Sequence, residues 1–253
     1  MRFVLVALFA LTGCAASRAA MPTLAVYPLA EPAQVLEENH FSRDLMGVGE
    51  PELRQILAAP VFLEEHARIG VLPVRAGYAP DDGVPVEGAP ATLTDALDGS
   101  GLFDLASEVA TDWPTTTGTA GLRELAARYR TEYVLLYRHR FADVTHANGF
   151  AAGFVTLIGA LFLPGTTIES AGVLEATLFD VKTGTILFTV HERVRSEAIS
   201  LPLSVEGRMA SMHRDMLKDA AKKLSVQVLL RCQRLVATRP ANLAPVAGLS
   251  PSY

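Results

Sequence analysis

The chain is poor in cysteine and in charge. It contains only two cysteines, Cys14 and Cys232, in 253 residues, so we expect no disulfide framework. Charged residues make up 19% of the chain, the formal net charge is −5, and lysine and arginine form only short local runs. Nucleic acid is therefore not expected as a partner. Apolar residues make up 50% of the chain, which is enough to build a packed core.

Catalytic and metal-binding motifs are also missing from the sequence. Glu64-Glu65-His66 is not followed by the second histidine that a helical zinc site requires. The histidines are scattered, and we expect two of them, His139 and His191, to face solvent on strands. The sequence has neither a glycine-rich phosphate loop nor a nucleophile elbow. We therefore predict no catalytic residue, no metal and no cofactor, and we interpret Cys232 as an apolar side chain on a helix.

The N-terminus has the pattern of a secretory signal. Arg2 supplies a positive charge, and an uninterrupted apolar run follows at 3–11. This run is far shorter than the ~20 residues that a helix needs to cross a bilayer, but it matches the apolar region of a signal peptide. Leu11-Thr12-Gly13-Cys14 comes next. This tetrapeptide resembles the lipobox of bacterial lipoproteins, in which small residues precede an invariant cysteine.

The lipobox resemblance implies cleavage after Gly13, a diacylglycerol thioether on Cys14 and an acyl chain, such as palmitate, on the new amine. Several chains make anchoring stable, because each buried CH₂ contributes ~0.8 kcal/mol. Ala15 follows the cysteine, whereas enteric lipoproteins retained in the inner membrane usually carry Asp there. We therefore expect a cell-envelope lipoprotein on the periplasmic face of the outer membrane, with the lipid bilayer as a partner. The alternative is an ordinary signal peptide with an incidental cysteine.

Four segments are expected along the chain. They are a signal peptide at 1–13, a lipid-anchored flexible tether at 14–48, a single α+β periplasmic domain at 49–236 and a disordered tail at 237–253. The tether is rich in Ala, Pro and Glu without apolar periodicity, which lets a domain stand off a membrane surface.

Hydrophobic periodicity in the domain predicts a mixed sheet of about five strands covered by helices, in the order β-α-β-α-β-(apolar segment)-β-β-α. We expect a first helix near Pro51 with Leu53, Ile56 and Leu57 on one face. A strand at 68–74 ended by Pro73 follows, then a loop at 76–90 and a helix capped by Thr92 and Asp95. Next come a strand at 102–110, a helix with an apolar stripe at 122–129, and a strand from 133 to 137 or as far as 144. The last elements are a hairpin of 172–181 with 185–195 and a long helix at 205–234 whose methionine stripe faces the core.

An apolar stretch in the middle of the chain has three open interpretations. Residues 144–168 contain no Asp, Glu, Lys or Arg, and 149–163 are almost wholly apolar. As a helix, 149–163 would span about 22 Å at ~1.5 Å per residue, short of the ~30 Å hydrocarbon core of a bilayer. The stretch is a buried core segment, a segment that contacts the membrane or inserts on oligomerisation, or a surface for a partner protein. The candidate membrane or partner contacts are Phe150, Phe154, Leu157, Ile158, Leu161 and Phe162.

The layout resembles a group of periplasmic lipoprotein domains. Arg68–Val74, Gly101-Leu-Phe103, Tyr133–Tyr137 and Thr183-Gly184 are similar in order to elements of the curli-secretion lipoprotein, of the N-terminal domain of the Tol-system beta-propeller protein and of the lipoprotein activators of penicillin-binding proteins. This resemblance covers about residues 68–230 and is one of pattern rather than of a single motif.

A closer resemblance is to the rhombotarget lipoprotein family. The resemblance rests on Phe154-Val-Thr-Leu-Ile-Gly159 within the apolar stretch, Leu174–Asp180, Leu187-Phe188 and the long terminal helix. The match spans most of the mature chain. It implies a lipoprotein domain, and it brings no established activity with it.

Three functions follow as hypotheses. The first is a non-enzymatic adaptor or assembly factor that binds another envelope protein, because an anchor and a flexible leader precede a compact domain without catalytic motifs. The second is an oligomeric secretion or pore component that uses the apolar stretch 147–165 and forms a homo-oligomer. The third is an enzyme whose site is assembled from dispersed residues, which would require perturbed carboxylates or histidines to meet in one pocket.

Overall fold

A computed structural model describes residues 49–75, 79–80, 88–109, 118–149 and 164–240. It confirms the α+β class, the mixed sheet and the predicted order of elements. In chain order the elements are α2 (Glu50–Ala58), β1 (Ala67–Arg75), β2 (Ala79–Pro80), α3 (Ala89–Asp98), β3 (Phe103–Glu108), α4 (Gly118–Tyr129), β4 (Tyr133–Ala147), β5 (Thr166–Asp180), β6 (Thr185–Ser200), the 3-10 turn η3 (Pro202–Ser204) and α6 (Val205–Ala237).

The sheet combines parallel and antiparallel strands. Its order is β2-β1-β4-β5-β6, and β3 pairs with β1 as well. β1 runs parallel to β3 and to β4, whereas β4, β5 and β6 form an antiparallel meander. The sixth strand, beyond the five expected, is the two-residue β2, which pairs with the end of β1 inside the segment predicted as a loop.

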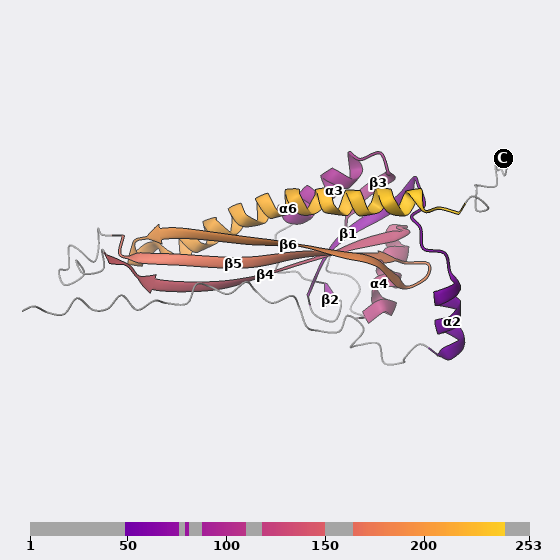
Figure 1. Cartoon of the computed structure of the whole chain (residues 1–253), viewed down its shortest axis with the longest axis horizontal. Coiled ribbons are helices and arrows are strands. Elements are labelled where there is room, and N and C mark those ends of the chain that lie inside the picture. Colours follow the sequence, from indigo (N-terminus) through magenta and orange to yellow (C-terminus); the bar gives the residue numbers. More distant parts are fainter. Residues whose placement is uncertain (1–48, 76–78, 81–87, 110–117, 150–163, 241–253) are drawn as a thin grey trace, which may run out of the picture.

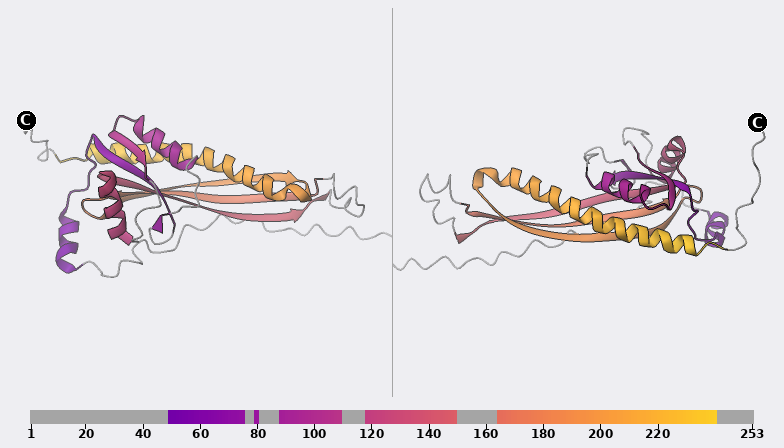
Figure 2. Two further views of the ribbon diagram at one scale, coloured as in Figure 1. Left: turned by 180° about the vertical axis from the view of Figure 1, so that it is seen from behind. Right: turned by 90° about the horizontal axis from the view of Figure 1, so that it is seen from above.

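The molecule consists of a compact head and a long arm (Figure 1). The head contains β1, β3, α3 and α4, and the arm is formed by β4, β5 and β6 as they extend away from it. These strands have 15, 15 and 16 residues, so each is about 50 Å long at ~3.3 Å per residue. α6, with 33 residues, lies along one face of the arm (Figure 2). α4 covers the opposite face at the head.

Apolar side chains fill both faces of the sheet in the head. On the face toward α6, the core includes Leu135 and Leu178 from the strands and Leu224 from the helix. Farther along the arm, Met212 and Met216 pack with Ile168, which confirms the methionine stripe of α6 as core. On the opposite face, α4 packs on the residues of β1, β4 and β5 that point away from α6, among them Leu72, Leu136 and Phe179.

Two predicted element boundaries are wrong. Thr92 does not cap α3: the helix begins at Ala89 after Gly88, and the Thr92 hydroxyl donates to the Gly88 carbonyl at 2.9 Å. Pro90 sits in the first turn, where its missing N–H costs nothing. Pro73 does not end β1 either, because the pairing with β3 stops at Val71 and that with β2 starts at Val74. The proline therefore occupies a gap in the ladder on that side.

The first helix forms as predicted, but its apolar face is not buried. α2 carries a proline in its first turn, which favours a helix start at that point. Leu53 and Leu57 are nevertheless 42% and 83% exposed. The pattern therefore predicted the helix correctly and gave no information about what covers it.

The hairpins are longer than the sequence predicts. β4 continues to Ala147, which pairs with Thr166 at the start of β5. The next two residues, Asn148 and Gly165, are also hydrogen-bonded across the hairpin, because the Asn148 N–H donates to the Gly165 carbonyl at 2.9 Å. The apolar stretch therefore connects β4 and β5 at the end of the arm farthest from the head.

Candidate functional site: a cavity beside α6 and an open sheet face

The residues singled out from the sequence as sites lie outside the part of the chain that the structure describes. This holds for the predicted lipid attachment at Cys14 with its lipobox residues Leu11, Thr12 and Gly13. It also holds for the predicted contact residues Phe150, Phe154, Leu157, Ile158, Leu161 and Phe162. Those assignments stay predictions, and the described residues bring two other features together.

The first feature is a half-open cavity between α3, β4 and α6. Its volume is about 800 Å³, and most of its lining is apolar. Cavities of ~300–1,000 Å³ are typical of sites for small molecules. The lining comes from the first turns of α3, from one face of β4 and from one stripe of α6, and comprises Gly88, Ala89, Pro90, Ala91, Thr92, Asp95, Tyr137, His139, Ala210, His213, Arg214, Leu217 and Lys218.

A ladder of four rings runs along the β4 and α6 walls. Tyr137, His139 and Phe141 alternate along β4 and therefore share the face toward α6. Tyr137 stacks on His139 with centroids 5.7 Å apart, and His139 contacts Phe141 at 5.8 Å. His213 from α6 stacks on Phe141 at 4.1 Å. The expectation that His139 faces solvent is wrong, since the side chain lies in the cavity wall, while His191 is exposed as expected.

Tyr137 brings a polar group into this apolar wall. Its side chain is 0% exposed, and its hydroxyl has no hydrogen-bond partner among the described residues. Burial raises its pKa, so the phenol is neutral at physiological pH. Tyr133, on the same face four residues earlier, differs because its hydroxyl accepts a hydrogen bond from the Glu64 N–H at 3.1 Å. The Tyr137 hydroxyl is therefore a buried donor that a bound molecule could satisfy.

Positive charge gathers on one side of the cavity. Arg214 and Lys218 are one turn apart on α6, both are exposed, and neither forms an ion pair within the described ranges. The N-terminus of α3 also lines the cavity, and no side chain caps it. The partial positive charge of a helix N-terminus attracts anions. Asp95 is the acidic residue among those that line the cavity.

Ser170, His213 and Asp143 meet beside the ladder, but not as a catalytic triad. The same ring atom, His213 Nε2, lies 2.8 Å from Asp143 Oδ1 and 3.1 Å from Ser170 Oγ. In a triad, the serine and the carboxylate bind opposite nitrogens of the imidazole, so that one nitrogen takes the proton while the other is held. Ser170 is also 0% exposed. This cluster therefore fixes the His213 ring and does not activate a nucleophile.

The second feature is the arm face opposite α6, which we call the open face. Arg140 of β4 and Arg193 of β6 flank Val173 of β5 in one rung of the sheet. Both arginines are exposed, and neither has an ion-pair partner in the described part of the chain. Strand spacing places their Cα atoms about 10 Å apart. The open face thus presents the positive charge of Arg140 and Arg193 on β4 and β6, whereas Val173 between them is buried.

Two ion pairs neighbour these arginines on the open face. Arg138 Nε donates to Glu175 Oε1 at 3.2 Å, and both side chains are buried. Arg195 Nη2 donates to Glu169 Oε2 at 3.3 Å, with the carboxylate buried and the guanidinium half-exposed. These carboxylates are each matched by an arginine, so they do not neutralise Arg140 and Arg193.

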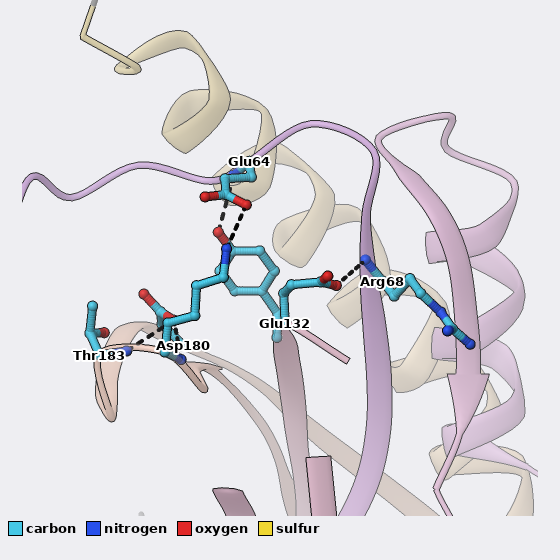
Figure 3. A network of polar contacts seen from close by, with 7 residues as sticks. Glu64, Arg68, Glu132, Asp180 and Thr183 are labelled. Atoms are coloured by element: carbon cyan, nitrogen blue, oxygen red, sulfur yellow. Dashed lines mark hydrogen bonds and ion pairs between the residues drawn. The ribbon is translucent and has the colours of Figure 1, made fainter. Parts of the chain in front are cut away.

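A third polar cluster, at the head, is structural (Figure 3). Asp180 Oδ1 accepts hydrogen bonds from the N–H groups of Lys182 and Thr183 and so closes the turn between β5 and β6. The Lys182 ammonium reaches Glu64 Oε2 at 2.9 Å. Glu132 Oε2 accepts from the Arg68 N–H at 2.8 Å, which fixes the start of β1. Each of these carboxylates accepts a hydrogen bond from another residue of the chain. The cluster therefore holds the segment before β1 against the turn between β5 and β6.

Within the described ranges, no group of His, Cys, Asp and Glu side chains has the geometry to hold a metal ion. A bilayer-crossing helix, long and apolar enough for that role, is also absent from those ranges.

No protein-family model and no curated protein matches the chain. Solved structures are similar at low identity. The PelC dodecamer from Paraburkholderia phytofirmans is 16% identical with a TM-score of 0.34, over 69% of this chain and 91% of that one. The rare lipoprotein B of Shewanella oneidensis is 11% identical with a TM-score of 0.35, over 66% of this chain and 96% of that one. The LpoB C-terminal domain from Salmonella enterica is 17% identical with a TM-score of 0.29, over 58% of this chain and 94% of that one.

With TM-scores below 0.5, these similarities assign neither a family nor an activity to the chain. The resemblance to the rhombotarget lipoprotein family therefore stays a prediction.

Sequence reasoning missed both the cavity and the open face. His139 and His213 are far apart in sequence, and both contact the Phe141 ring because α6 folds back over β4. One signal was available: Tyr137, His139 and Phe141 alternate directly after a buried strand, which places three rings on one face. For Arg140 and Arg193, the signal would have been the register of three long strands, which no local pattern gives.

Proposed function

We propose that this chain is a lipid-anchored lipoprotein of the bacterial cell envelope whose domain is a non-enzymatic adaptor for another envelope protein. The anchor is the acylated Cys14 on the periplasmic face of the outer membrane, and residues 15–48 are the tether. The lipobox and the apolar run before it support the anchor. The adaptor role rests on the open face.

The observation that carries the adaptor role is the pair of unpaired arginines on the open face. Arg140 and Arg193 project from β4 and β6, on either side of β5, in a meander whose other face is covered by α6. A sheet that is packed on one side holds its other side rigid, and fixed surface charges steer and orient a partner of opposite charge. We therefore expect the partner to present acidic side chains to this face.

A non-enzymatic role agrees with the chemistry of the described polar groups. His213, the histidine best placed between a serine and a carboxylate, contacts both through one nitrogen. The buried carboxylates of the arm are matched with arginines. Such pairs hold structure and leave no group free to transfer a proton.

The anchor is tested by replacing the cysteine. We expect Cys14→Ser to abolish cleavage and acylation, so the protein keeps its signal peptide and loses the added acyl mass in intact-protein mass spectrometry. A matched control is Cys232→Ser, which leaves the lipobox unchanged and should keep the acyl mass. An unmodified wild-type chain, with both variants equally membrane-bound, would contradict the proposed anchor.

The adaptor role is tested by photocrosslinking in intact cells. A photoreactive residue at Val144, four residues beyond Arg140 on the same face of β4, should give a defined crosslinked band, whereas one at exposed Arg231 on α6 should not. The double variant Arg140→Glu and Arg193→Glu should remove the band, and Lys222→Glu with Arg231→Glu should keep it. Equal bands at both positions, unaffected by charge reversal, would count against the open face.

A second candidate is an oligomeric secretion or pore component. The pairing of Ala147 with Thr166 places both ends of the apolar stretch at the tip of the arm. Asn148 lies eleven residues beyond Tyr137, about 36 Å farther along the strand, so the stretch starts far from the main core. This position supports a contact with a membrane or with other copies. Detergent-extracted protein that runs only as a monomer would eliminate the candidate.

A further inference from the structure

We propose that the cavity between α3, β4 and α6 binds an anionic amphiphile, a molecule with an alkyl body and a carboxylate or phosphate head. This site is separate from the open face and from the anchor, so it stands or falls independently of the adaptor role.

The size and lining of the cavity suit an alkyl body. About 800 Å³ lined mainly by apolar groups, among them Pro90, Ala210 and Leu217, removes an alkyl chain from water. Each CH₂ transferred contributes to binding, and a preformed cavity requires no opening of the core. A wholly polar ligand would leave these groups without a partner.

The charged side of the cavity suits an anionic head. Arg214 and Lys218 stand one turn apart on α6, and residues 89–91 in the uncapped first turn of α3 line the same cavity. Two cations and a helix N-terminus that line the same apolar cavity attract a carboxylate or phosphate. Asp95 is the one acidic residue in the described part of the lining, and its charge offsets only one of the two cations, so the lining keeps a net positive charge.

Tyr137 provides an independent observation that points to a ligand. Its fully buried hydroxyl lacks a partner among the described residues, although it belongs to the cavity wall. Leaving a buried hydroxyl without a hydrogen bond is unfavourable, and native proteins satisfy nearly all such groups. An oxygen of the head group can accept a hydrogen bond from this phenol. The folded protein thus holds a donor in the cavity wall whose hydrogen bond an occupant of the cavity can complete.

Calorimetric titration tests the proposal with three probes. The protein is the chain from residue 14 carrying Cys14→Ser, which contains every described element and needs no detergent that would compete. Octyl phosphate, octanol and inorganic phosphate are titrated in turn. We expect saturable binding of octyl phosphate, at least tenfold weaker binding of octanol, and no binding of inorganic phosphate.

Each alternative result overturns a specific part of the proposal. Equal binding of octanol would remove the role of the anionic head, and equal binding of inorganic phosphate would replace the amphiphile by a free anion. Absence of binding by all three probes would overturn the proposal altogether. Octanoate in place of octyl phosphate then distinguishes a preference for carboxylate from one for phosphate, and binding of either supports the site.

Matched variants locate the binding. Arg214→Gln with Lys218→Gln should weaken octyl phosphate binding at least tenfold, whereas Lys222→Gln with Arg231→Gln, on the outer side of α6, should leave it unchanged. Tyr137→Phe should weaken binding severalfold without loss of the circular dichroism of the fold. Ala210→Trp should fill the cavity and abolish binding. Equal affinities of all these variants would show that the probe binds elsewhere.

Discussion

The rings of Phe141 and His213 stack with their centroids 4.1 Å apart and their planes 6° from parallel. This contact depends on a missing side chain. Phe141 pairs with Gly172 across β4 and β5, and a Cβ at Gly172 would come within 2.5 Å of the phenyl ring. The glycine thus lets the ring lie flat on the neighbouring strand, where it supports the histidine in the cavity wall.

We expect Gly172→Ala to destabilise the protein by about 1–3 kcal/mol, because the added methyl group forces the Phe141 ring away from β5. Urea unfolding followed by circular dichroism measures the change. Gly207→Ala is the matched control, because Gly207 is an exposed residue of α6 with nothing within 4 Å of an added Cβ. This substitution should stabilise the protein by about 0.5–1 kcal/mol. A Gly172→Ala variant as stable as the wild type would show that the ring does not need the glycine.

Two buried tyrosines on β4 should respond in opposite ways to loss of the hydroxyl. Tyr137→Phe removes a buried hydroxyl without a described partner, so we expect it to stabilise the ligand-free protein by roughly 1 kcal/mol. Tyr133→Phe leaves the Glu64 N–H without its acceptor and should destabilise by about 1 kcal/mol. The midpoints of chemical unfolding measure both. Destabilisation by Tyr137→Phe would mean that its hydroxyl is already satisfied in the free protein.

The buried ion pair of Arg138 and Glu175 should be costly to break. Glu175→Gln removes the Glu175 carboxylate from a buried guanidinium, which costs about 3–5 kcal/mol. Glu50→Gln is the control, because it breaks an exposed pair with Arg54 and should cost less than about 0.5 kcal/mol. Unfolding by urea at constant pH compares the two. A similarly small loss of unfolding free energy in both variants would show that water reaches the pair of Arg138 and Glu175.

Cys232 should be inert in the native state. Burial raises the pKa of its thiol to about 12, and a protonated thiol is a poor nucleophile. With Cys14 acylated or replaced, we expect no reaction with a thiol reagent at pH 8 until the protein is unfolded in guanidinium, when one equivalent reacts. Rapid reaction of the native protein would contradict the burial of α6 against the sheet.

Stability should fall at alkaline pH. The pKa of the Cys232 thiol rises from 9.0 to about 12 on folding, and burial raises the pKa of Tyr133 from 10.0 to about 12. The native state therefore holds these protons more tightly than the unfolded state. Their contribution is complete below pH 9 and is lost as the pH rises toward 12. Unfolding midpoints measured at pH 8, 10 and 11 should decrease in that order, and a constant midpoint would contradict the burial of both groups.

Local patterns predicted most of the elements because each depends on neighbours in sequence. The stripe from Met212 to Val228 identified α6 and its buried face, and Asp180 with Gly184 identified the turn between β5 and β6. The capping interpretation of Thr92 failed because α3 already begins at Ala89, with Pro90 in its first turn. Pro73 failed as a strand end because a gap in the partner strands accommodates it.

The candidate site could not be predicted in the same way. Its walls come from residues 88–95, 137–139 and 210–218, and nothing in any of these segments specifies the other two. In the sequence, His139 stands between the two charged residues Arg138 and Arg140, which is typical of a solvent-facing segment. Only the packing of α6 over the odd-numbered side of β4 reverses that interpretation.

The route by which the chain enters the head has a mechanical consequence. The Leu63 N–H donates to the Leu235 carbonyl at 3.2 Å, and the Thr238 hydroxyl donates to the Val61 carbonyl at 3.2 Å. The entering segment is thus fastened to the last turn of α6. Tension applied through the N-terminal side would load these bonds first and would pull along the axis of the helix. The far ends of β4 and β5, at the other end of that axis, would then point away from the site at which the N-terminal segment is held (Figure 2).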